Sequence, residues 1–539
     1  MLSVRGARLS TVTEFPAAAS ERQRRVMTSK WDMTCDTLMV GSGAGGVCGA
    51  YTAAREGLEV ILVEATEKFG GTSAFSGGGV WFPGNPVLER AGTDDTIEDA
   101  LTYYTAVVGD RTPRELQETY IRGGGPLIGY LEQEEIFEFA PYPWPDYYGN
   151  APKARQDGMR HILPPPLPVA DAGELNSLIR GPLDTERLGA PLPDELVGGR
   201  SLIGRFLLAI SQYDNASLQL NTTLVELVVE DHKVVGAIVE SGGQRKAIGA
   251  RKGVLLAAGG FEQNDELRQR FGVPGVARDS MGSWANIGKA LEAAIAVGAD
   301  TDLMDQAWWS PGFTHPDGRS AFSLAITAGV FVNDAGERFV NESAPYDRLA
   351  REVIARMADG AVTLPYWLVY DNRNGIVPPV GVTNVSMVEP AKFQDAGLWQ
   401  TADTLEELAE KIGVPAANLV ATVQRYNEMS AKGADSDFHR GEEAYDRAFT
   451  EGRKPLTPID QGPFHAAAFG ISDLGTKGGL RTDTQARVLD AAGAPITGLY
   501  AAGNTMAAPS GPTYPGGGNP IGTSMLFAHL AAMDMVAVG

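Results

Sequence analysis

The chain has 539 residues, 43% of them hydrophobic and 21% charged, an ordinary balance for a globular protein long enough to form two or more domains. Its formal net charge of −22 argues against nucleic acid or an anionic membrane as the main partner, because either would need a basic surface. The 65 glycines are nearly twice the usual ~7% share, which favours tight turns and close backbone approach to a ligand.

Residues 1–35 are interpreted as a disordered N-terminal extension, or in part as an upstream-extended start ahead of Met27. The first 26 residues lack the uninterrupted apolar core of a secretion signal, so secretion is not expected. Cys35 and Cys48 are too few for a disulfide framework, so we expect small buried side chains in a reducing compartment. No uninterrupted run of about 18 apolar residues is present, and no integral membrane segment is predicted. These features favour a cytoplasmic protein; they indicate no particular oligomeric state.

Regular structure is expected to begin at Asp36. The run TLMVGSGAGGVCGAYTAAREGLEVILVEA predicts a strand, a glycine turn, a helix and a second strand that ends at Glu64. Gly41, Gly43 and Gly46 form a GxGxxG pattern between the first strand and the helix. Glu64 follows about 20 residues later, where a carboxylate can accept hydrogen bonds from a ribose. The segment therefore predicts a dinucleotide-binding βαβ unit.

A second glycine- and serine-rich loop, KFGGTSAFSGGGVWFPGN, spans Lys68 to Asn85. A loop so close to the βαβ unit would lie along the pyrophosphate and continue towards a ring system, as a buried flavin requires. A second GxGxxG that would mark a separate nicotinamide site is absent from the sequence. FAD is therefore the predicted cofactor.

The middle of the chain divides into further blocks. Residues 93–138 have helical spacing, and the aromatic, proline-rich loop FAPYPWPDYYGN covers 139–150. Strand patterns return between 201 and 300, ending in RKGVLLAAGGFEQN. Residues 301–460 form a different block, with the segment FVNDAGERFVNESAPYDR and a helical stretch around 405–429.

The C-terminal part returns to the nucleotide-binding pattern with GLYAAGNTMAAPS, followed by the loop GPTYPGGGNPIG and the apolar helical segment TSMLFAHLAAM. The predicted fold class is thus α/β. We expect a Rossmann-like FAD-binding domain built from the discontinuous segments 36–300 and 461–539. A substrate or cap domain of α+β type is expected to be inserted at 301–460.

Four motifs in this order resemble the fumarate reductase-type flavoproteins: GSGAGG, GGTSAFSGGGVW, VLLAAGGFEQN and AAGN with IGTSMLFAHLAA. Within that superfamily, FVNESAPYDR together with TYPGGGN is similar to the 3-ketosteroid dehydrogenases, especially the Δ1 enzymes. The resemblance covers most of 36–539. It implies FAD-dependent oxidation of an apolar cyclic ketone: a base removes the proton α to the carbonyl, a hydride leaves the β carbon for flavin N5, and a conjugated enone forms. The sequence has no CxxCH haem motif, so an external electron acceptor, a quinone or similar, is expected.

The resemblance also assigns catalytic roles. Tyr514 supplies a phenolic donor to the substrate carbonyl, and Gly518 supplies a backbone N–H to the same oxygen. Tyr346 is the implied base; an unperturbed phenol has a pKa near 10 and needs neighbouring groups that stabilise its anion. The family places a second tyrosine beside this base, in an aromatic loop. The loop offers Tyr142, Tyr147 and Tyr148; the Asp-Tyr step favours Tyr147, and the adjacent Tyr148 is the open alternative.

The motifs also indicate residues at the cofactor, and the helix beyond the last of them would favour negative charge on the flavin. The predicted FAD-binding residues are Gly41, Gly43, Ala44, Gly46, Glu64, Ala65, Gly71, Thr72, Ser73, Ser76, Gly78, Gly79, Val225, Ala258, Gly259, Gly503, Asn504, Asn519, Pro520 and Ile521.

Alternative functions follow from the same sequence. The ending NPIGTSMLFAHLAA departs from the usual steroid pattern, which leaves open a smaller cyclic ketone such as cyclohexanone. A dicarboxylate oxidoreductase would need clustered arginine and histidine, which the substrate segments lack. A flavin-binding protein without turnover leaves the two tyrosine loops unexplained. The six histidines lack metal-ligand spacing, and Trp144, Trp308 and Trp309 are assigned to the core rather than to the site.

Overall fold

The computed structural model describes residues 31–450, 452 and 454–538. Strand β1 begins at Met33, before the expected start at Asp36, because Asp32 already pairs with Ala247 of a neighbouring strand. The predicted disordered extension is therefore too long at its C-terminal end. Its first 30 residues lie outside the described residues.

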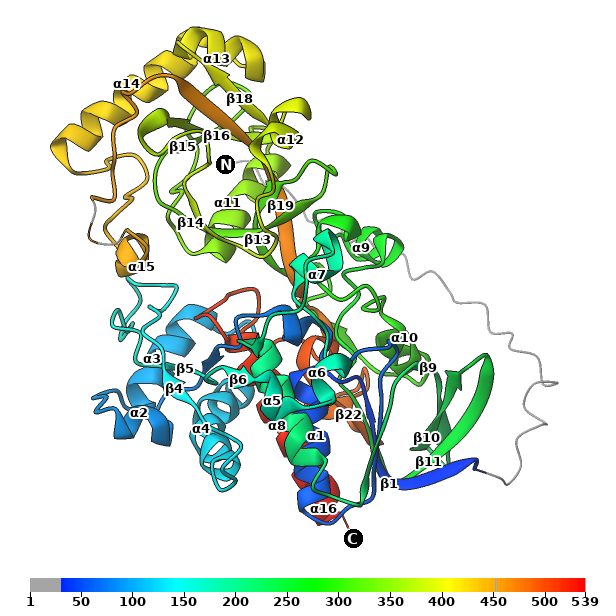
Figure 1. Cartoon of the computed structure of the whole chain (residues 1–539). Coiled ribbons are helices and arrows are strands. Elements are labelled where there is room, and N and C mark those ends of the chain that lie inside the picture. Colours follow the sequence, from blue (N-terminus) through cyan, green and yellow to red (C-terminus); the bar gives the residue numbers. More distant parts are fainter. Residues whose placement is uncertain (1–30, 451, 453, 539) are drawn as a thin grey trace, which may run out of the picture.

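An eight-stranded sheet forms the lower part of the molecule (Figure 1). Its main path runs β21-β22-β11-β1-β2-β8, with β22, β11, β1, β2 and β8 parallel to one another. An antiparallel extension through β10 and β9 continues from β11. The strands are β1 (Met33–Val40), β2 (Val60–Val63), β8 (Ala216–Gln219), β9 (Thr222–Glu230), β10 (Lys233–Ser241), β11 (Gln244–Leu256), β21 (Arg487–Leu489) and β22 (Pro495–Ala501).

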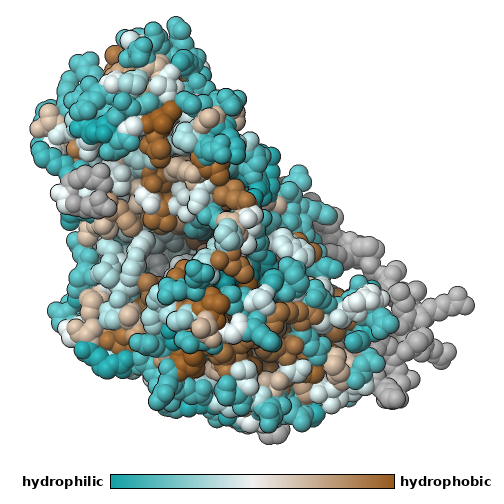
Figure 2. Space-filling view, in the orientation of Figure 1, coloured by the Kyte–Doolittle hydropathy of each residue, from teal (hydrophilic) through white to brown (hydrophobic). Residues whose placement is uncertain are grey.

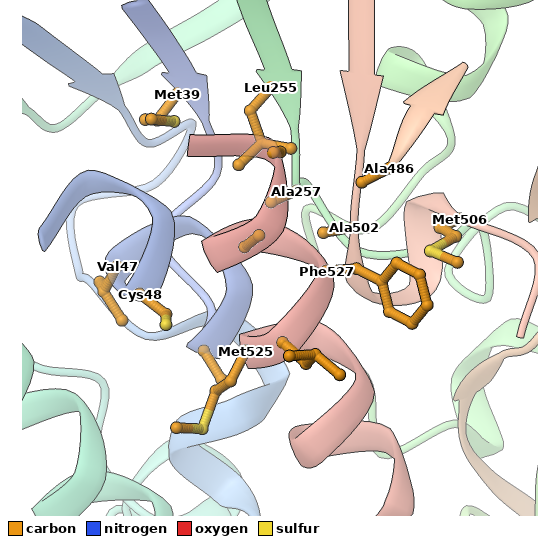
Figure 3. Close-up of a cluster of buried hydrophobic side chains, with 14 of the residues drawn as sticks. Met39, Val47, Cys48, Leu255, Ala257, Ala486, Ala502, Met506, Met525 and Phe527 are labelled. Carbon is orange, nitrogen blue, oxygen red and sulfur yellow. The ribbon is translucent and has the colours of Figure 1, made fainter. Parts of the chain in front are cut away.

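Helix α1 (Ala44–Arg55) connects β1 to β2 and packs against α16 (Asn519–Ala537) and α8 (Gly199–Ile210). The approach of α16 depends on glycines of α1, because a Cβ on Gly45 would lie 3.0 Å from the Ser524 carbonyl oxygen. Figure 3 shows part of this core, where Cys48 of α1 lies near Met525 of α16. Both cysteines are buried and free, as predicted from their apolar surroundings.

A seven-stranded antiparallel sheet forms the upper part (Figure 1), in the order β15-β16-β19-β13-β14-β17 with β18 beside β19. The strands are β13 (Ala307–Thr314), β14 (Ser320–Ile326), β15 (Val330–Val332), β16 (Tyr366–Asp371), β17 (Val380–Thr383), β18 (Trp399–Ala402) and β19 (Phe464–Thr476). The helices of this part are α11 (Tyr346–Ala358), α12 (Pro390–Asp395), α13 (Leu405–Ile412), α14 (Ala416–Lys432) and α15 (Ala444–Ala448).

The predicted boundary at residue 460 is wrong for this strand. β19, assigned by the sequence to the FAD-binding segment, pairs along its length with β13, β16 and β18 of the upper sheet. It is the orange strand that descends from the upper to the lower part in Figure 1. The upper sheet therefore extends beyond residue 460, as far as Thr476.

Shorter elements and further helices complete the lower part. They are α2 (Pro86–Arg90), α3 (Ile97–Val108), α4 (Arg114–Leu131), α5 (Val169–Ala172), α6 (Leu175–Leu178), α7 (Leu183–Leu188), α9 (Asp265–Phe271), α10 (Lys289–Ala296), β3 (Val80–Trp81), β4 (Ala140–Pro141), β5 (His161–Leu163), β6 (Leu167–Pro168), β7 (Glu195–Leu196), β12 (Thr301–Asp302) and β20 (Gly479–Leu480).

Among the described residues, α16 is the one helix long and apolar enough to cross a membrane by length and composition. Half of its apolar window is buried inside the structure, where α16 packs against α1 and β11. A core helix of a globular protein passes the same test.

Candidate active site

A cavity of about 630 Å³ lies between the two parts of the molecule and takes lining residues from both. One end is formed by the glycine turn after β1 and by the end of β2, and the other by aromatic and aliphatic side chains. Figure 2 shows apolar side chains on the surface where the upper and lower parts meet. The site therefore combines a polar, glycine-lined end with an apolar one.

The glycine turn brings backbone close to the cavity. Gly41 has φ +99°, and a Cβ there would lie 2.4 Å from the Ala257 carbonyl oxygen. The N-cap of α1 is Gly43, which has no side chain to cap the N–H groups of the first turn. Ser73 accepts a hydrogen bond from the Ala44 backbone at 3.0 Å and ties the second loop to this terminus. Backbone donors and helix dipole together suit a pyrophosphate.

Glu64 directly follows β2, lines the cavity and is held from both sides. Its Oε2 accepts hydrogen bonds from the Ser42 backbone at 3.1 Å and from the Ser42 hydroxyl at 2.5 Å. Its Oε1 accepts from the backbone and hydroxyl of Thr66, both at 2.9 Å. The carboxylate is thus fixed in orientation, and each oxygen can accept a further bond from a ribose hydroxyl.

Most of the predicted FAD-binding residues line one continuous cavity. These residues are Gly41, Gly43, Ala44, Glu64, Ala65, Gly71, Thr72, Ser73, Ser76, Gly78, Gly79, Ala258, Gly259, Gly503, Asn504, Pro520 and Ile521. They come from three separated stretches of the chain, which supports a cofactor site assembled from discontinuous segments.

Three predicted residues do not line the cavity. Gly46 is needed for packing instead, since a Cβ there would lie 1.9 Å from the Gly41 carbonyl oxygen. Val225 of β9 is not part of the lining, although Thr222, Thr223 and Leu224 directly before it are. Asn519 is completely buried at the first turn of α16.

Sequence reasoning missed the stretch 281–291, much of which lines the same cavity. The Ser283 backbone and the Asn286 side chain each donate to Thr72 Oγ1 at 2.9 Å, so this stretch fixes the second glycine loop. The segment WANIGK lacks a recognisable motif. Its position before helix α10, whose N-cap is Gly288, is the signal that could have identified it.

We expect Gly41→Ala to lose FAD during purification, because the new Cβ would overlap backbone and the positive φ would cost about 1–3 kcal/mol. The measurement is the ratio of flavin to protein absorbance, with Tm followed by circular dichroism. Gly129→Ala in α4 is the matched control, since its Cβ meets only Pro86 at 3.7 Å. Full FAD occupancy in Gly41→Ala would contradict the role given to this turn.

Three phenols meet at the apolar end of the cavity. The ring centroids of Tyr147 and Tyr346 are 5.4 Å apart, those of Tyr147 and Tyr514 5.1 Å, and those of Tyr346 and Tyr514 5.6 Å. All three line the cavity and are almost completely buried. They come from the aromatic loop, the start of α11 and the loop before α16. We name Tyr147, Tyr346 and Tyr514 the phenol cluster.

Hydrogen bonds to the backbone of Tyr147 connect the loops that carry the phenol cluster. The Tyr147 N–H donates to the Pro515 carbonyl at 3.0 Å, one residue beyond Tyr514. The Tyr147 carbonyl accepts from Arg348 at 2.9 Å, two residues beyond Tyr346. Arg348 is held in turn by Glu443, at 2.8 and 3.0 Å. Tyr147 is thus fixed by the neighbours of both other phenols.

Tyr147 and Tyr148 have different surroundings. Tyr147 accepts a hydrogen bond from Trp144 Nε1 at 3.2 Å and lines the cavity. The ring of Tyr148 instead packs under the Arg348 guanidinium, whose carbon is 5.3 Å from the ring centroid, and does not line the cavity. Of the two tyrosines, Tyr147 therefore reaches the cluster.

Gly518 is the N-cap of α16, with φ +90° and no side-chain capping bond. A Cβ at this position would lie 2.4 Å from the Gly79 carbonyl oxygen, so only glycine fits between this loop and the second glycine loop. Gly518 and Tyr514 both line the cavity. The structure therefore places a phenol and a helix N-terminus beside the same space.

Burial keeps the phenol cluster neutral. It raises the pKa of Tyr346 well above the usual value, with the Tyr147 and Tyr514 phenols adding to the shift. Burial also raises the pKa of Tyr147, helped by Tyr445 and Tyr514. For Tyr514 burial again raises the pKa, while Tyr346 and the Gly518 backbone act in the opposite direction. Before substrate binds, each phenol is a hydrogen-bond donor.

The cavity lining contains few charged groups among the described residues. Lys289 and Glu64 lie at the end formed by the nucleotide-binding motifs, and no arginine lines the cavity. His161 also lines it, but burial lowers the pKa of this imidazole to about 3, so it is neutral. The apolar end therefore offers no cation to a charged substrate.

Some lining residues at the apolar end were assigned by the sequence to the core. Trp144 and Trp308 line the cavity, whereas Trp309 does not and packs under Arg351. The Trp308 ring lies 4.8 Å from that of Tyr514. A fourth buried phenol, Tyr445, lies 5.2 Å from Tyr147 behind the cluster. Two tryptophans in succession on a strand are the signal that one of them could face a site.

The glycine cradle, the helix N-termini and the fixed Glu64 fit FAD, and the fold with this site defines an FAD-dependent oxidoreductase. The FAD binding domain family matches residues 36–521. The chain is 35% identical to a 3-oxosteroid 1-dehydrogenase of Mycolicibacterium smegmatis, covering 93% of this chain and 97% of the relative. It is also 35% identical to a 4-oxocyclohexanecarboxylate 2-dehydrogenase of Sinomonas cyclohexanicum, covering 92% of each.

Among solved structures, a 3-ketosteroid Δ1-dehydrogenase from Sterolibacterium denitrificans matches with a TM-score of 0.85 at 30% identity, covering 94% of this chain and all of that one. The chain therefore belongs to the 3-ketosteroid Δ1-dehydrogenase-like flavoproteins, with the FAD-binding fold of that family. It is an FAD-dependent ketone dehydrogenase. This confirms the predicted family and cofactor.

Proposed function

We propose that this enzyme introduces a double bond between C1 and C2 of a 3-ketosteroid. The observation that carries the proposal is the convergence of Tyr147, Tyr346 and Tyr514 at an apolar end of the FAD cavity that lacks a cation among the described lining residues. Phenols and apolar walls suit a neutral ketone that must enolise. Relatives at 35–36% identity named as 3-oxosteroid 1-dehydrogenases support the choice of substrate.

The chain's own groups activate the ketone. Tyr514 and the Gly518 backbone N–H donate hydrogen bonds to the carbonyl oxygen and stabilise the negative charge that develops there. Tyr346 takes the proton from C2, with Tyr147 beside it to share the proton and stabilise the phenolate. Tyr346 is the first residue of α11, where the positive end of the helix dipole favours an anion. Bound FAD supplies the hydride acceptor.

The upper part of the molecule acts in this proposal as the substrate domain. It contributes Trp308, Phe322, Leu324 and Tyr346 to the cavity, whereas Tyr147, Tyr514 and the cofactor residues belong to the lower part. The substrate thus binds at the junction of the two parts. An external acceptor such as a quinone then reoxidises the flavin.

A dicarboxylate substrate is disfavoured by the same cavity. Two carboxylates need several cationic donors, preferably arginine, and no described residue of the apolar end supplies one. A monocyclic ketone is the second candidate, favoured by the equal identity to the 4-oxocyclohexanecarboxylate 2-dehydrogenase. The carboxylate of that compound would lack a counter-charge here, so a neutral cyclohexanone fits better.

A substrate panel tests the proposal. The holoenzyme is assayed with a soluble dye acceptor against 4-androstene-3,17-dione, cyclohexanone, 4-oxocyclohexanecarboxylate and succinate. We expect the highest kcat/KM for the steroid. Higher kcat/KM for cyclohexanone would retain the mechanism and replace the substrate, and turnover of succinate alone would overturn the proposed function.

Because Tyr147 lines the cavity and Tyr148 does not, substitution of each by phenylalanine should have a different effect. We expect Tyr147→Phe to slow flavin reduction by ketone at least ~10-fold, because the hydrogen bond between its hydroxyl and Tyr346 is lost. Tyr148→Phe retains the packing of the ring under Arg348, so it should change the rate of flavin reduction less than ~3-fold. Anaerobic stopped-flow of both variants decides the matter. Equal losses, or a larger loss in Tyr148→Phe, would show that the wrong tyrosine has been assigned.

A further inference from the structure

Lys477 is completely buried in the turn between β19 and β20, directly behind the loop that carries Tyr514. Its Nζ donates to the Thr513 carbonyl at 2.7 Å and to the Pro512 carbonyl at 3.1 Å. The same nitrogen lies 3.8 Å from the centroid of the Trp308 ring and 5.9 Å from that of Tyr514. Lys477 is not among the residues that line the cavity.

The surroundings of this nitrogen match an ammonium group. Two backbone carbonyls and the face of an indole are three acceptors, which correspond to the three N–H donors of a protonated lysine. A neutral amine would present a lone pair, and none of the described residues donates a hydrogen bond to this nitrogen.

Burial opposes the charge and lowers the pKa of Lys477 well below its usual value. Asp347 raises this pKa and Arg351 lowers it, and these two side chains are paired at 2.7 Å on α11. The carbonyls and the indole ring are what offset the loss of hydration.

The position of Lys477 connects two neighbours of Tyr514. The Thr513 carbonyl belongs to the residue before Tyr514, and the Trp308 ring packs edge-on against the phenol at 4.8 Å. A single side chain thereby fixes both the backbone and the ring that hold this phenol. Loss of the side chain would free the loop on the side away from the cavity.

We propose that Lys477 is a positioning residue for Tyr514: it fixes the Pro512–Thr513 backbone and the Trp308 ring, and so holds the phenol where the ketone oxygen must bind. The inference rests on the proposed function, because it assigns Lys477 a part in stabilising the enolate. Positive charge behind the phenol also makes its O–H a stronger donor to a developing negative charge.

A double-mutant cycle tests the inference in the FAD-loaded enzyme. Lys477→Met keeps the length of the side chain and removes the charge and its donors; we expect flavin reduction by ketone to slow roughly 10- to 100-fold, the scale for hydrogen bonds of charged groups. KM should change much less than kcat. In a Tyr514→Phe background the same substitution should have almost no further effect, because residues that act through one another are not additive.

Controls separate positioning from folding. FAD content and Tm are measured for each variant, and Lys411→Met is the matched control, since Lys411 also donates to a backbone carbonyl but lies at the surface of the upper part. If Lys477→Met does not retain FAD, Lys477→Gln takes its place in the cycle with the same expected result.

Each outcome decides for or against the inference. A rate loss in Lys477→Met that disappears in the Tyr514→Phe background supports it. An unchanged rate, or an equal loss in both backgrounds, overturns it while leaving the proposed function intact. Failure of the proposed function is recognised separately, because the wild-type flavin would then not be reduced by any cyclic ketone.

Discussion

Tyr346→Phe is expected to slow flavin reduction by ketone about 10²- to 10⁴-fold, the usual contribution of a positioned general base. The phenol lies 5.4 Å from Tyr147 and 5.6 Å from Tyr514, ring centre to ring centre, and no histidine that titrates near neutral pH lines the cavity among the described residues. Removing the hydroxyl leaves only the phenols of Tyr147 and Tyr514, which are weak bases at neutral pH because burial raises their pKa as well. Anaerobic stopped-flow of the holoenzyme measures the rate.

The rate of flavin reduction should depend on pH in a defined direction. Because burial and the neighbouring phenols raise the pKa of Tyr346, the group is protonated at neutral pH, and the rate should rise as pH increases. The pKa of the Tyr514 donor is raised as well, so its proton is retained over the same range.

The matched control is Tyr366→Phe, a completely buried tyrosine of the upper sheet that does not line the cavity. Its rate should equal that of the wild type. A Tyr346→Phe enzyme that reacts at the wild-type rate, or whose rate keeps the wild-type rise with pH, would remove Tyr346 from its assigned role.

Tyr514→Phe is expected to lower the rate of flavin reduction about 10²- to 10³-fold, the loss found when one donor to a developing oxyanion is removed. The effect should appear in kcat more than in KM, because the hydrogen bond strengthens as charge develops on the oxygen. The Gly518 backbone N–H remains, which is why the loss stays smaller than complete inactivation.

FAD content and Tm of the Tyr514→Phe variant serve as the control for a structural effect. The Phe ring retains the edge contacts with Trp308 and Tyr147, so FAD content and Tm should be those of the wild type. A rate loss accompanied by loss of FAD would show a structural effect. An unchanged rate would contradict the role of Tyr514 as an oxyanion donor.

The elements that the sequence predicts well are those fixed by local chemistry. The GxGxxG turn at Gly41 and the carboxylate of Glu64 lie within one βαβ unit, where spacing alone determines their relative positions. The family and the cofactor follow from such motifs. The same holds for the loop of Tyr514, whose Gly and Pro content marks an irregular segment before a helix.

The features that escaped prediction depend on contacts between distant segments. β19 has the apolar composition of a core strand, but its partners are decided by the upper sheet, not by its own residues. Val225 lies just beyond the part of β9 that lines the cavity, a limit that depends on the packing around the strand. The sequence pattern around Trp308 is typical of a core residue. Its ring becomes part of the site because the Tyr514 loop packs against it.

Choosing between Tyr147 and Tyr148 also required the fold. Both are aromatic residues of one loop, and the Asp-Tyr step in the sequence favours Tyr147 without excluding Tyr148. In the structure Arg348 on α11 binds the Tyr147 carbonyl and covers the Tyr148 ring, and of the two tyrosines Tyr147 lines the cavity.

The most direct test of the proposed desaturation is a single turnover of the FAD-loaded enzyme with 4-androstene-3,17-dione in the absence of acceptor, followed by flavin absorbance and product analysis. We expect the flavin to be reduced and one equivalent of steroid with a new C1–C2 double bond to form per FAD. Deuterium at C1 and C2 should slow the reaction and be lost from both carbons. A flavin that stays oxidised with this steroid and with cyclohexanone, or a double bond formed elsewhere in the ring, would contradict the assigned reaction.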